Sequence, residues 1–330
     1  MNLQTTYLGL NLKNPLVVGA SPLGDKLDRA RQLEDAGASA IVFHSLFEEQ
    51  IKRDAEATEF HTTSHAESSA EATSYFPLQD EFVHGPDEYL AHLSKAREAL
   101  SIPVIASLNG VTPGGWLEYA KRIEEAGADA LELNLYHVPT DPAESAAAVE
   151  SRLIQTVEGL HSHIKIPLSV KLSPYHTAPV HFTNQLVKAG ARGLVLFNRF
   201  FQPDIDIELL EASPRLQLSE STELLLRLRW LAILEGQCEA DLALTGGVHN
   251  TQDAIKSLMA GATVIQLVSS LLRHGPSHLS SLLESLQDWL TQHEYESIAQ
   301  LRGCMSLKHC PDPAAYERGN YMRILQGWRM

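Results

Sequence analysis

Cysteine is scarce in this chain, with only Cys238, Cys304 and Cys310 among 330 residues. An odd and sparse set of thiols does not build a disulfide framework, and it predicts reduced cysteines in a cytoplasmic protein. Five residues separate Cys304 from Cys310, with His309 between them, whereas zinc sites usually contain tighter pairs. We therefore expect no metal site in this chain.

Basic residues and long apolar runs are also lacking. Lysine and arginine total 26 against 41 aspartates and glutamates, and the formal net charge of −15 disfavours binding to nucleic-acid phosphates. No apolar run reaches the roughly 18 residues of a spanning helix. Residues 1–12 show neither the basic start nor the apolar stretch of a signal peptide. These absences predict a soluble protein with no membrane partner.

Short apolar segments recur after the same three-residue motif. Four Ala-Gly-Ala triplets, centred on Gly37, Gly127, Gly190 and Gly261, each follow a helical pattern and precede an apolar run. Glycine ends a helix in a left-handed conformation without a Cβ penalty, and such runs are typical of buried parallel strands. With four further runs, the predicted strands are 14–18, 41–43, 102–105, 131–133, 166–170, 194–196, 241–244 and 264–266. The predicted helices are 27–36, 86–100, 114–126, 144–161, 180–189, 222–234, 251–259 and 276–291.

Eight strand-then-helix units favour a (β/α)8 TIM barrel over an open doubly wound sheet. An open sheet of the Rossmann type should carry a glycine-rich fingerprint after its first strand, where Pro22 instead interrupts the sequence. We predict a single domain over residues 1–330, with long loops at 46–85 and 199–221. Both loops leave the carboxyl ends of strands, where barrel enzymes hold their sites. The C-terminal extension, 302–330, is expected to pack against the barrel.

A phosphate site is predicted after the last two strands. Gly246 and Gly247 follow the seventh strand, and their backbone amides can approach a phosphate closely. Ser269 and Ser270 follow the eighth strand and supply hydroxyl groups. The alternative is that the glycine pair only forms a tight turn.

Polar side chains at other strand ends suggest a cofactor that combines a ring with a phosphate. Lys171 ends the fifth strand, where it can pair with a structural carboxylate such as Glu132 or donate to an electron-rich ring, as in a reduced flavin. Asn109, Asn134 and Asn198 end the third, fourth and sixth strands, with amides suited to a planar heterocycle. A single such asparagine more often forms a turn.

Two histidines are candidates for acid–base chemistry. His137 lies in the loop after the fourth strand, and His44 ends the second strand. Imidazole titrates near neutrality and can move a proton at working pH. With fifteen histidines in the chain, a structural or surface role for either residue stays open.

These residues together resemble the dihydroorotate dehydrogenase family of FMN-dependent (β/α)8 barrels. The resemblance implies that Ala20, Ser21 and Ser45 line the flavin, with Asn109 nearby and Asn134 and Lys171 on its ring system. It implies further that the phosphate lies on Gly246, Gly247, Ser269 and Ser270, and that the protein is a homodimer of the soluble class. The segments that carry the resemblance are Tyr7–Leu10, Leu12–Pro15, Gly19–Ser21, Leu133–Leu135, Val170–Leu172, Asn198, Thr245–Gly247 and Gly261–Ala262.

The sequence departs from the family where substrate should bind. The family's fourth-strand loop reads Asn-Leu-Ser-Cys-Pro-Asn, with cysteine or serine as the base, whereas this chain has Tyr136 and His137 in the middle and Pro139 at the end. His44 replaces a lysine, and the asparagine-rich loop has become 68–73. A glycine-rich stretch after the sixth strand has become 213–219. Orotate would lose charge-assisted bonds to its carboxylate in such a site.

The resulting hypothesis is a flavoprotein oxidoreductase that acts on a CH–CH bond of a planar substrate, with FMN as cofactor. His137 would take a proton, Lys171 would stabilise the reduced flavin, and His44, Tyr136 and Asn198 would contact the substrate. Dihydroorotate to orotate is the leading reaction. One alternative is an FMN barrel that acts on another unsaturated ring or carbonyl. Another is a flavin-free, phosphate-binding barrel that acts as an aldolase, a decarboxylase or a sensor.

Overall fold

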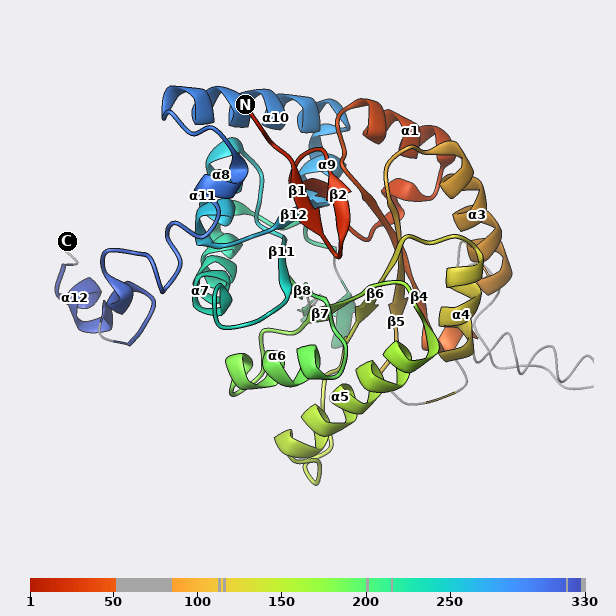
Figure 1. Cartoon of the computed structure of the whole chain (residues 1–330). Coiled ribbons are helices and arrows are strands. Elements are labelled where there is room, and N and C mark those ends of the chain that lie inside the picture. Colours follow the sequence, from red (N-terminus) through yellow and green to blue (C-terminus); the bar gives the residue numbers. More distant parts are fainter. Residues whose placement is uncertain are drawn as a thin grey trace, which may run out of the picture.

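The eight predicted parallel strands form a closed barrel in the computed structural model of the chain (Figure 1). The structure describes residues 1–51, 85–111, 114, 117–199, 202–214, 216–318 and 320–327. The strand order around the barrel is β11-β12-β3-β4-β5-β6-β7-β8, so neighbours in sequence are neighbours in space. The strands are β3 (Leu16–Val18), β4 (Ile41–Phe47), β5 (Val104–Asn109), β6 (Ala130–Asn134), β7 (Leu168–Leu172), β8 (Gly193–Leu196), β11 (Asp241–Thr245) and β12 (Val264–Leu267). The TIM-barrel prediction is confirmed.

Helices surround the barrel close to the predicted positions (Figure 1). At Gly190, which ends one of them, φ is +113° and an added Cβ would lie 2.3 Å from the His161 ring, so only glycine fits this turn. The surrounding helices are α1 (Leu27–Asp35), α3 (Pro86–Ala99), α4 (Leu117–Glu125), α5 (Ala146–His163), α6 (Pro179–Lys188), α7 (Leu224–Leu234), α8 (Thr251–Ala260) and α10 (Ser277–Gln292). In the described part of the chain, none of the helices combines the length and apolar character needed to cross a membrane.

An antiparallel hairpin of β1 (Thr5–Tyr7) and β2 (Leu10–Leu12) closes one end of the barrel. Tyr7 and Leu8 are buried together with inward-facing strand residues such as Val42 and Ile105. The backbone N–H of Leu8 donates to Asp241 Oδ2 at 2.7 Å. Since this hairpin fills the amino-terminal side of the strands, the carboxyl ends are left for a site.

The two long loops extend from these carboxyl ends. Residues 52–84, which include the predicted substrate stretch 68–73, lie outside the described residues. The loop after β8 contains a second hairpin, β9 (Pro203–Asp206) and β10 (Glu211–Pro214), that sequence reasoning did not predict. Shorter elements are the 3-10 turns η1 (Pro22–Gly24), η4 (Ser221–Glu223) and η5 (Pro313–Ala315), with helices α9 (Ser269–His274), α11 (Ile298–Leu301) and α12 (Asn320–Gly327).

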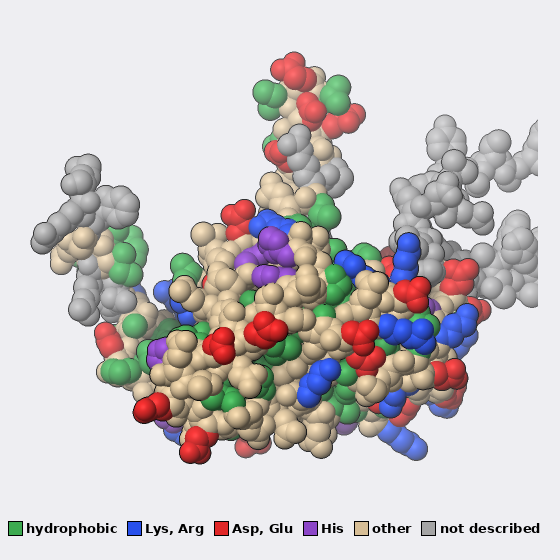
Figure 2. Space-filling view, turned by 90° about the horizontal axis from the view of Figure 1, so that it is seen from above, with side chains coloured by type: hydrophobic (Ala, Val, Ile, Leu, Met, Phe, Trp, Pro, Cys, Tyr) green, Lys and Arg blue, Asp and Glu red, His purple; other side chains and the backbone are tan. Residues whose placement is uncertain are grey.

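The C-terminal extension packs on the barrel only in its first part. Backbone bonds tie Met305 to Met259 and Leu307 to Ala232. Beyond the prolines at 311 and 313 the chain turns away, and α12 stands off the body of the molecule with Tyr321 65% exposed (Figures 1 and 2). The expectation that the whole tail packs against the barrel is therefore wrong for α12; Trp328 lies outside the described residues.

Candidate functional site

A cavity of about 640 Å³ opens at the carboxyl ends of the barrel strands. Residues from or just after β3, β4, β6, β7, β8, β11 and β12 line it, which is the face where TIM barrels hold their sites. The predicted site residues that it brings together are Ala20, Ser21, His44, Ser45, Asn134, Lys171, Asn198, Gly246, Gly247 and Ser269. Asn109, Tyr136, His137 and Ser270 do not line it.

The floor of this cavity holds a buried polar network. Lys171 Nζ on β7 lies 3.2 Å from Glu132 Oε1 on β6, and Gln266 Nε2 on β12 donates to Glu132 Oε2 at 2.6 Å. Glu132 is fully buried, and Lys171 is 7% exposed. Gln266 Oε1 is buried with no hydrogen-bond partner among the described residues. The structural partner considered for Lys171 is therefore present, and an unmatched acceptor lies at the same floor.

Two asparagines from the ends of β6 and β8, the strands on either side of β7, bond to each other. Asn198 Nδ2 donates to Asn134 Oδ1 at 2.6 Å. Their amides therefore lie together at the rim of the cavity. The Asn134 Nδ2 donor and the Asn198 Oδ1 acceptor are suited to hydrogen bonds with a planar ligand. Asn109, at the end of β5, is buried away from the lining.

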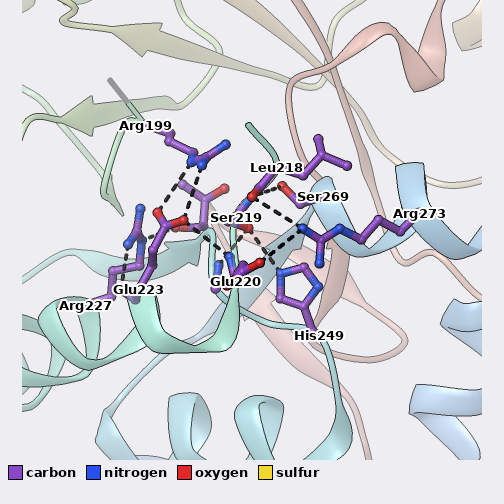
Figure 3. Close-up of polar contacts among 11 residues, drawn as sticks. Arg199, Leu218, Ser219, Glu220, Glu223, Arg227, His249, Ser269 and Arg273 are labelled. Carbon is purple, nitrogen blue, oxygen red and sulfur yellow. Dashed lines mark hydrogen bonds and ion pairs between the residues drawn. The ribbon is translucent and has the colours of Figure 1, made fainter. Parts of the chain in front are cut away.

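The loops after β11 and β12 meet the segment 216–223 at the other end of the cavity (Figure 3). Ser219 is 1% exposed; its backbone N–H donates to Ser269 Oγ at 3.0 Å, and its Oγ accepts from the Gly247 N–H at 3.2 Å. The same hydroxyl contacts His249 Nε2 at 3.3 Å. Burial, together with the nearby Arg273, lowers the pKa of His249, so this imidazole is neutral near pH 7.

The glycine pair has a structural reason as well. Gly246 and Gly247 both have φ of +84°, and a Cβ at Gly247 would lie 2.8 Å from the backbone nitrogen of Leu224. Arg227 lies against this turn: its Nε donates to the Thr245 carbonyl oxygen at 2.6 Å. Burial lowers the pKa of this guanidinium, which nevertheless stays charged at neutral pH. The turn is thus tight, as the alternative interpretation held, and a buried cation lies against it.

A histidine–carboxylate pair lies on the wall formed by β4 and η1. His44 Nδ1 is 2.6 Å from Asp25 Oδ1, and both residues line the cavity. The His44 ring meets the Tyr89 ring edge-on, with centroids 5.1 Å apart. Sequence reasoning singled out His44 but missed Asp25, because the two residues come from different strand–helix units and lie together only through the pairing of β3 with β4.

Comparison with known sequences gives the family. A sequence model of dihydroorotate dehydrogenase matches residues 2–290. The chain belongs to the dihydroorotate dehydrogenase family.

Relatives within this family carry more than one activity in their names. Over 322 residues the chain is 28% identical to a protein of Aeropyrum pernix named as a dihydroorotate dehydrogenase A (fumarate), covering 91% of this chain and 96% of the relative. It is 26% identical over 310 residues to the catalytic subunit of dihydroorotate dehydrogenase B (NAD(+)) of Thermoplasma volcanium, with 92% and 98% covered. It is 22% identical over 327 residues to the chloroplastic dihydropyrimidine dehydrogenase (NADP(+)) of Arabidopsis thaliana, with 92% and 76% covered. The chain is an oxidoreductase of this group.

In this dihydroorotate dehydrogenase family member, His137 stands at the position of the base in the loop after β6, but it does not line the large cavity. His137 lines a neighbouring cavity of about 360 Å³, together with Glu150 and His176. Arg152 Nη2 lies 3.0 Å from His137 Nε2, and Glu144 also contacts this nitrogen, at 3.6 Å. A guanidinium can only donate, so Nε2 of His137 accepts and its proton is on Nδ1. The proton-accepting role of His137 stays a prediction, and its position in the second cavity counts against it.

Other site residues could not be identified from sequence alone. Ser219 lies in the stretch where the family has glycines, but nothing in the sequence shows that its backbone reaches Ser269. Gln266 ends an apolar strand, and its inward position next to Glu132 follows from barrel closure. Tyr136, predicted as a substrate contact, is half-buried and lines neither cavity.

Proposed function

We propose that the protein is an FMN-dependent oxidoreductase that moves a hydride between the flavin and a CH–CH bond of a planar substrate. Dihydroorotate is the leading candidate for that substrate. The observation that carries the proposal is the large cavity, which runs from the Lys171–Gln266 floor to the Gly246–Gly247 turn and the hydroxyls of Ser219 and Ser269. One end offers charge and hydrogen bonds to a ring, and the other offers donors to a phosphate.

The residues present fit FMN at both ends. An isoalloxazine ring carries carbonyl acceptors and one imide N–H; the Lys171 ammonium supplies donors, and Gln266 Oε1 is an acceptor without a partner in the described part of the chain. At the other end, the Ser219 and Ser269 residues line the cavity, and the positive charge of the buried Arg227 lies behind the Gly246–Gly247 turn, which favours a phosphate. When bound, FMN supplies a carrier that accepts a hydride at N5.

Reconstitution with FMN tests this proposal. Protein purified with added FMN should retain it through gel filtration and show flavin absorption bands, and anaerobic dihydroorotate should bleach the visible band. A colourless protein that also fails to bind added FMN would contradict the proposal and favour the flavin-free, phosphate-binding barrel.

A second candidate is an FMN enzyme for an uncharged unsaturated ring. It is favoured by charge: Asp25 lines the cavity, Lys171 is paired with Glu132, and Arg199 is paired with Glu223. A substrate carboxylate would have to compete with these acids for its cations. Parallel anaerobic titrations with dihydroorotate and 5,6-dihydrouracil decide between the two, because the second candidate predicts faster bleaching by the neutral ring.

The remaining expectations concern assembly and location. The homodimer, the soluble branch of the family and the cytoplasmic location stay predictions, and sedimentation of the purified protein tests the first.

A further inference from the structure

We infer that His44, held by Asp25, is the acid–base residue of the oxidoreductase proposed above, and that Asp25 is its positioning residue. The inference rests on the proposed function, since it concerns the proton that accompanies hydride transfer. It assigns this role to the wall formed by β4 and η1, away from the loop after β6.

A bulge in β4 turns His44 toward the cavity. Val42 pairs with Ile105 and Ser45 pairs with Ser107, so two residues of β4 lie opposite one residue of β5. In a regular strand, consecutive side chains point to opposite faces, yet His44 and Ser45 both line the cavity. A bulge re-aims a side chain in this way and occurs often beside active sites.

The neighbouring residue fixes this irregular backbone from the outside. Phe43 is 1% exposed and meets the His92 ring edge-on, with centroids 5.2 Å apart. A Cβ added to Gly24 would lie 3.1 Å from the Phe43 ring, so η1 packs directly on β4. His92 Nε2 lies 2.9 Å from the Gly24 carbonyl oxygen. These contacts hold Asp25, the residue after Gly24, at a set distance from the bulge.

Among the described residues, Asp25 and Tyr89 hold the imidazole through two different kinds of contact. Asp25 Oδ1 accepts from His44 Nδ1 at 2.6 Å, and the Tyr89 ring meets the imidazole at an interplanar angle of 81°. Tyr89 is in turn anchored by the Ser107 N–H, which donates to its hydroxyl at 3.0 Å. With Nδ1 bonded to a carboxylate, the tautomer is set and Nε2 is the nitrogen that exchanges a proton with a substrate.

The rival imidazole has a different arrangement. His137 Nε2 is the nitrogen that contacts the Arg152 guanidinium, and the ring lines the other cavity. A base whose lone pair accepts from a guanidinium has to break that bond before it can take a proton. Of the two histidines singled out from the sequence, His44 is the one that lines the larger cavity, with a carboxylate on its Nδ1, which is the arrangement of a positioned base.

The step balances without another reactant. In the oxidative direction the substrate loses a hydride from one carbon to the flavin and a proton from the adjacent carbon to His44 Nε2, and a C=C bond forms between the two carbons. The product is an imidazolium paired with the Asp25 carboxylate. Among the described residues, the other charged groups that line the cavity are Lys171 and Arg199, each paired with a glutamate.

Single-turnover kinetics test the role of His44. In His44→Gln the amide can still donate to Asp25, so packing is kept while the base is removed. Anaerobic mixing with dihydroorotate, and separately with 5,6-dihydrouracil, should show flavin reduction slowed by about 10²–10⁴-fold, the usual worth of a positioned base. Retention of FMN and photochemical reduction of the flavin should be unchanged, because neither needs the base. His181→Gln, at an exposed position on α6, is the matched control and should react like the wild type.

Imidazole NMR of the flavin-free protein provides a readout that does not depend on turnover. Long-range ¹H–¹⁵N spectra should show a proton of His44 on Nδ1, assigned by the signals lost in His44→Gln. In Asp25→Ala, the population should shift toward the Nε2–H tautomer, and the reduction rate should fall while FMN is retained.

Several results overturn the inference. A His44→Gln protein reduced within about threefold of the wild-type rate, with His137→Gln instead slowed by the factor expected of a lost base, would move the role to His137 and leave the proposed function standing. If the wild type holds FMN but neither substrate reduces it, the proposed reaction fails, and the NMR result decides about the pair. An unchanged tautomer in Asp25→Ala would then overturn the positioning role.

Discussion

Replacing Lys171 with methionine should measure how much the Lys171–Glu132 ion pair at the floor of the cavity contributes to the free energy of unfolding. The change removes the ammonium and keeps an unbranched apolar stem. It leaves the fully buried Glu132 carboxylate with Gln266 Nε2, at 2.6 Å, as its remaining side-chain donor among the described residues. Removing one partner of a buried ion pair costs about 3–5 kcal/mol, because an uncompensated charge stays in a low dielectric.

The expected change in melting temperature follows from the length of the chain. An unfolding entropy of about 2.1 cal/mol/K per residue gives about 0.7 kcal/mol/K for a chain of 330 residues. A loss of about 3–5 kcal/mol in the free energy of unfolding therefore lowers Tm by about 4–7 °C. Calorimetry of the flavin-free protein at pH 7 measures this shift.

The double variant provides the control. Glu132→Gln added to Lys171→Met removes the stranded charge, so at least half of the lost stability should return, a non-additive result expected only for residues in contact. If Lys171→Met lowers Tm by less than about 1 °C, or if the second change adds its full cost to the first, then the two side chains are not paired in the protein and the description of the floor is wrong.

Three further predictions concern the phosphate end and a half-buried thiol. Gly247→Ala places a Cβ 2.8 Å from the Leu224 nitrogen at a φ of +84°; it should cost about 1–3 kcal/mol of stability, seen by calorimetry, and abolish FMN retention, and wild-type retention would refute the close approach. Ser219→Ala removes one hydrogen bond and should raise the FMN Kd about 2- to 10-fold by fluorescence titration, whereas tighter binding would mean that this hydroxyl blocks the phosphate. Partial burial raises the pKa of the Cys238 thiol to about 11, so its labelling by a thiol reagent at pH 8 should be slow until the protein is unfolded; rapid native labelling would contradict this raised pKa.

The barrel was predictable because its signals are local. Each Ala-Gly-Ala triplet joins a helix end to a strand start within a few residues, and the glycine conformation at Gly37, Gly127, Gly190 and Gly261 is positive in φ, as those turns require. The second hairpin, β9–β10, escaped prediction because its strands are exposed and carry no alternation of buried and exposed apolar residues.

The site was predictable only in part. The sequence shows which residues lie at the ends of strands, but it does not show which side chains those residues contact. Counting placed Lys171, Gly246, Gly247 and Ser269 on the same rim, and the cavity contains all four. The fourth-strand loop misled the same reasoning, because a loop residue can turn to either side of its strand. Arg152 and Glu144 draw His137 into the neighbouring cavity.

The order of elements, the identity of the strand ends and the loss of the family's usual base were determined by the chain itself, because each depends on residues a few positions apart. Strand pairing and closure of the barrel decided the rest. It set Asp25 beside His44 across 19 positions of sequence and Gln266 beside Glu132 across 134. Such pairs depend on the register of strands that are distant in sequence, and the bulge in β4 changes that register by one residue.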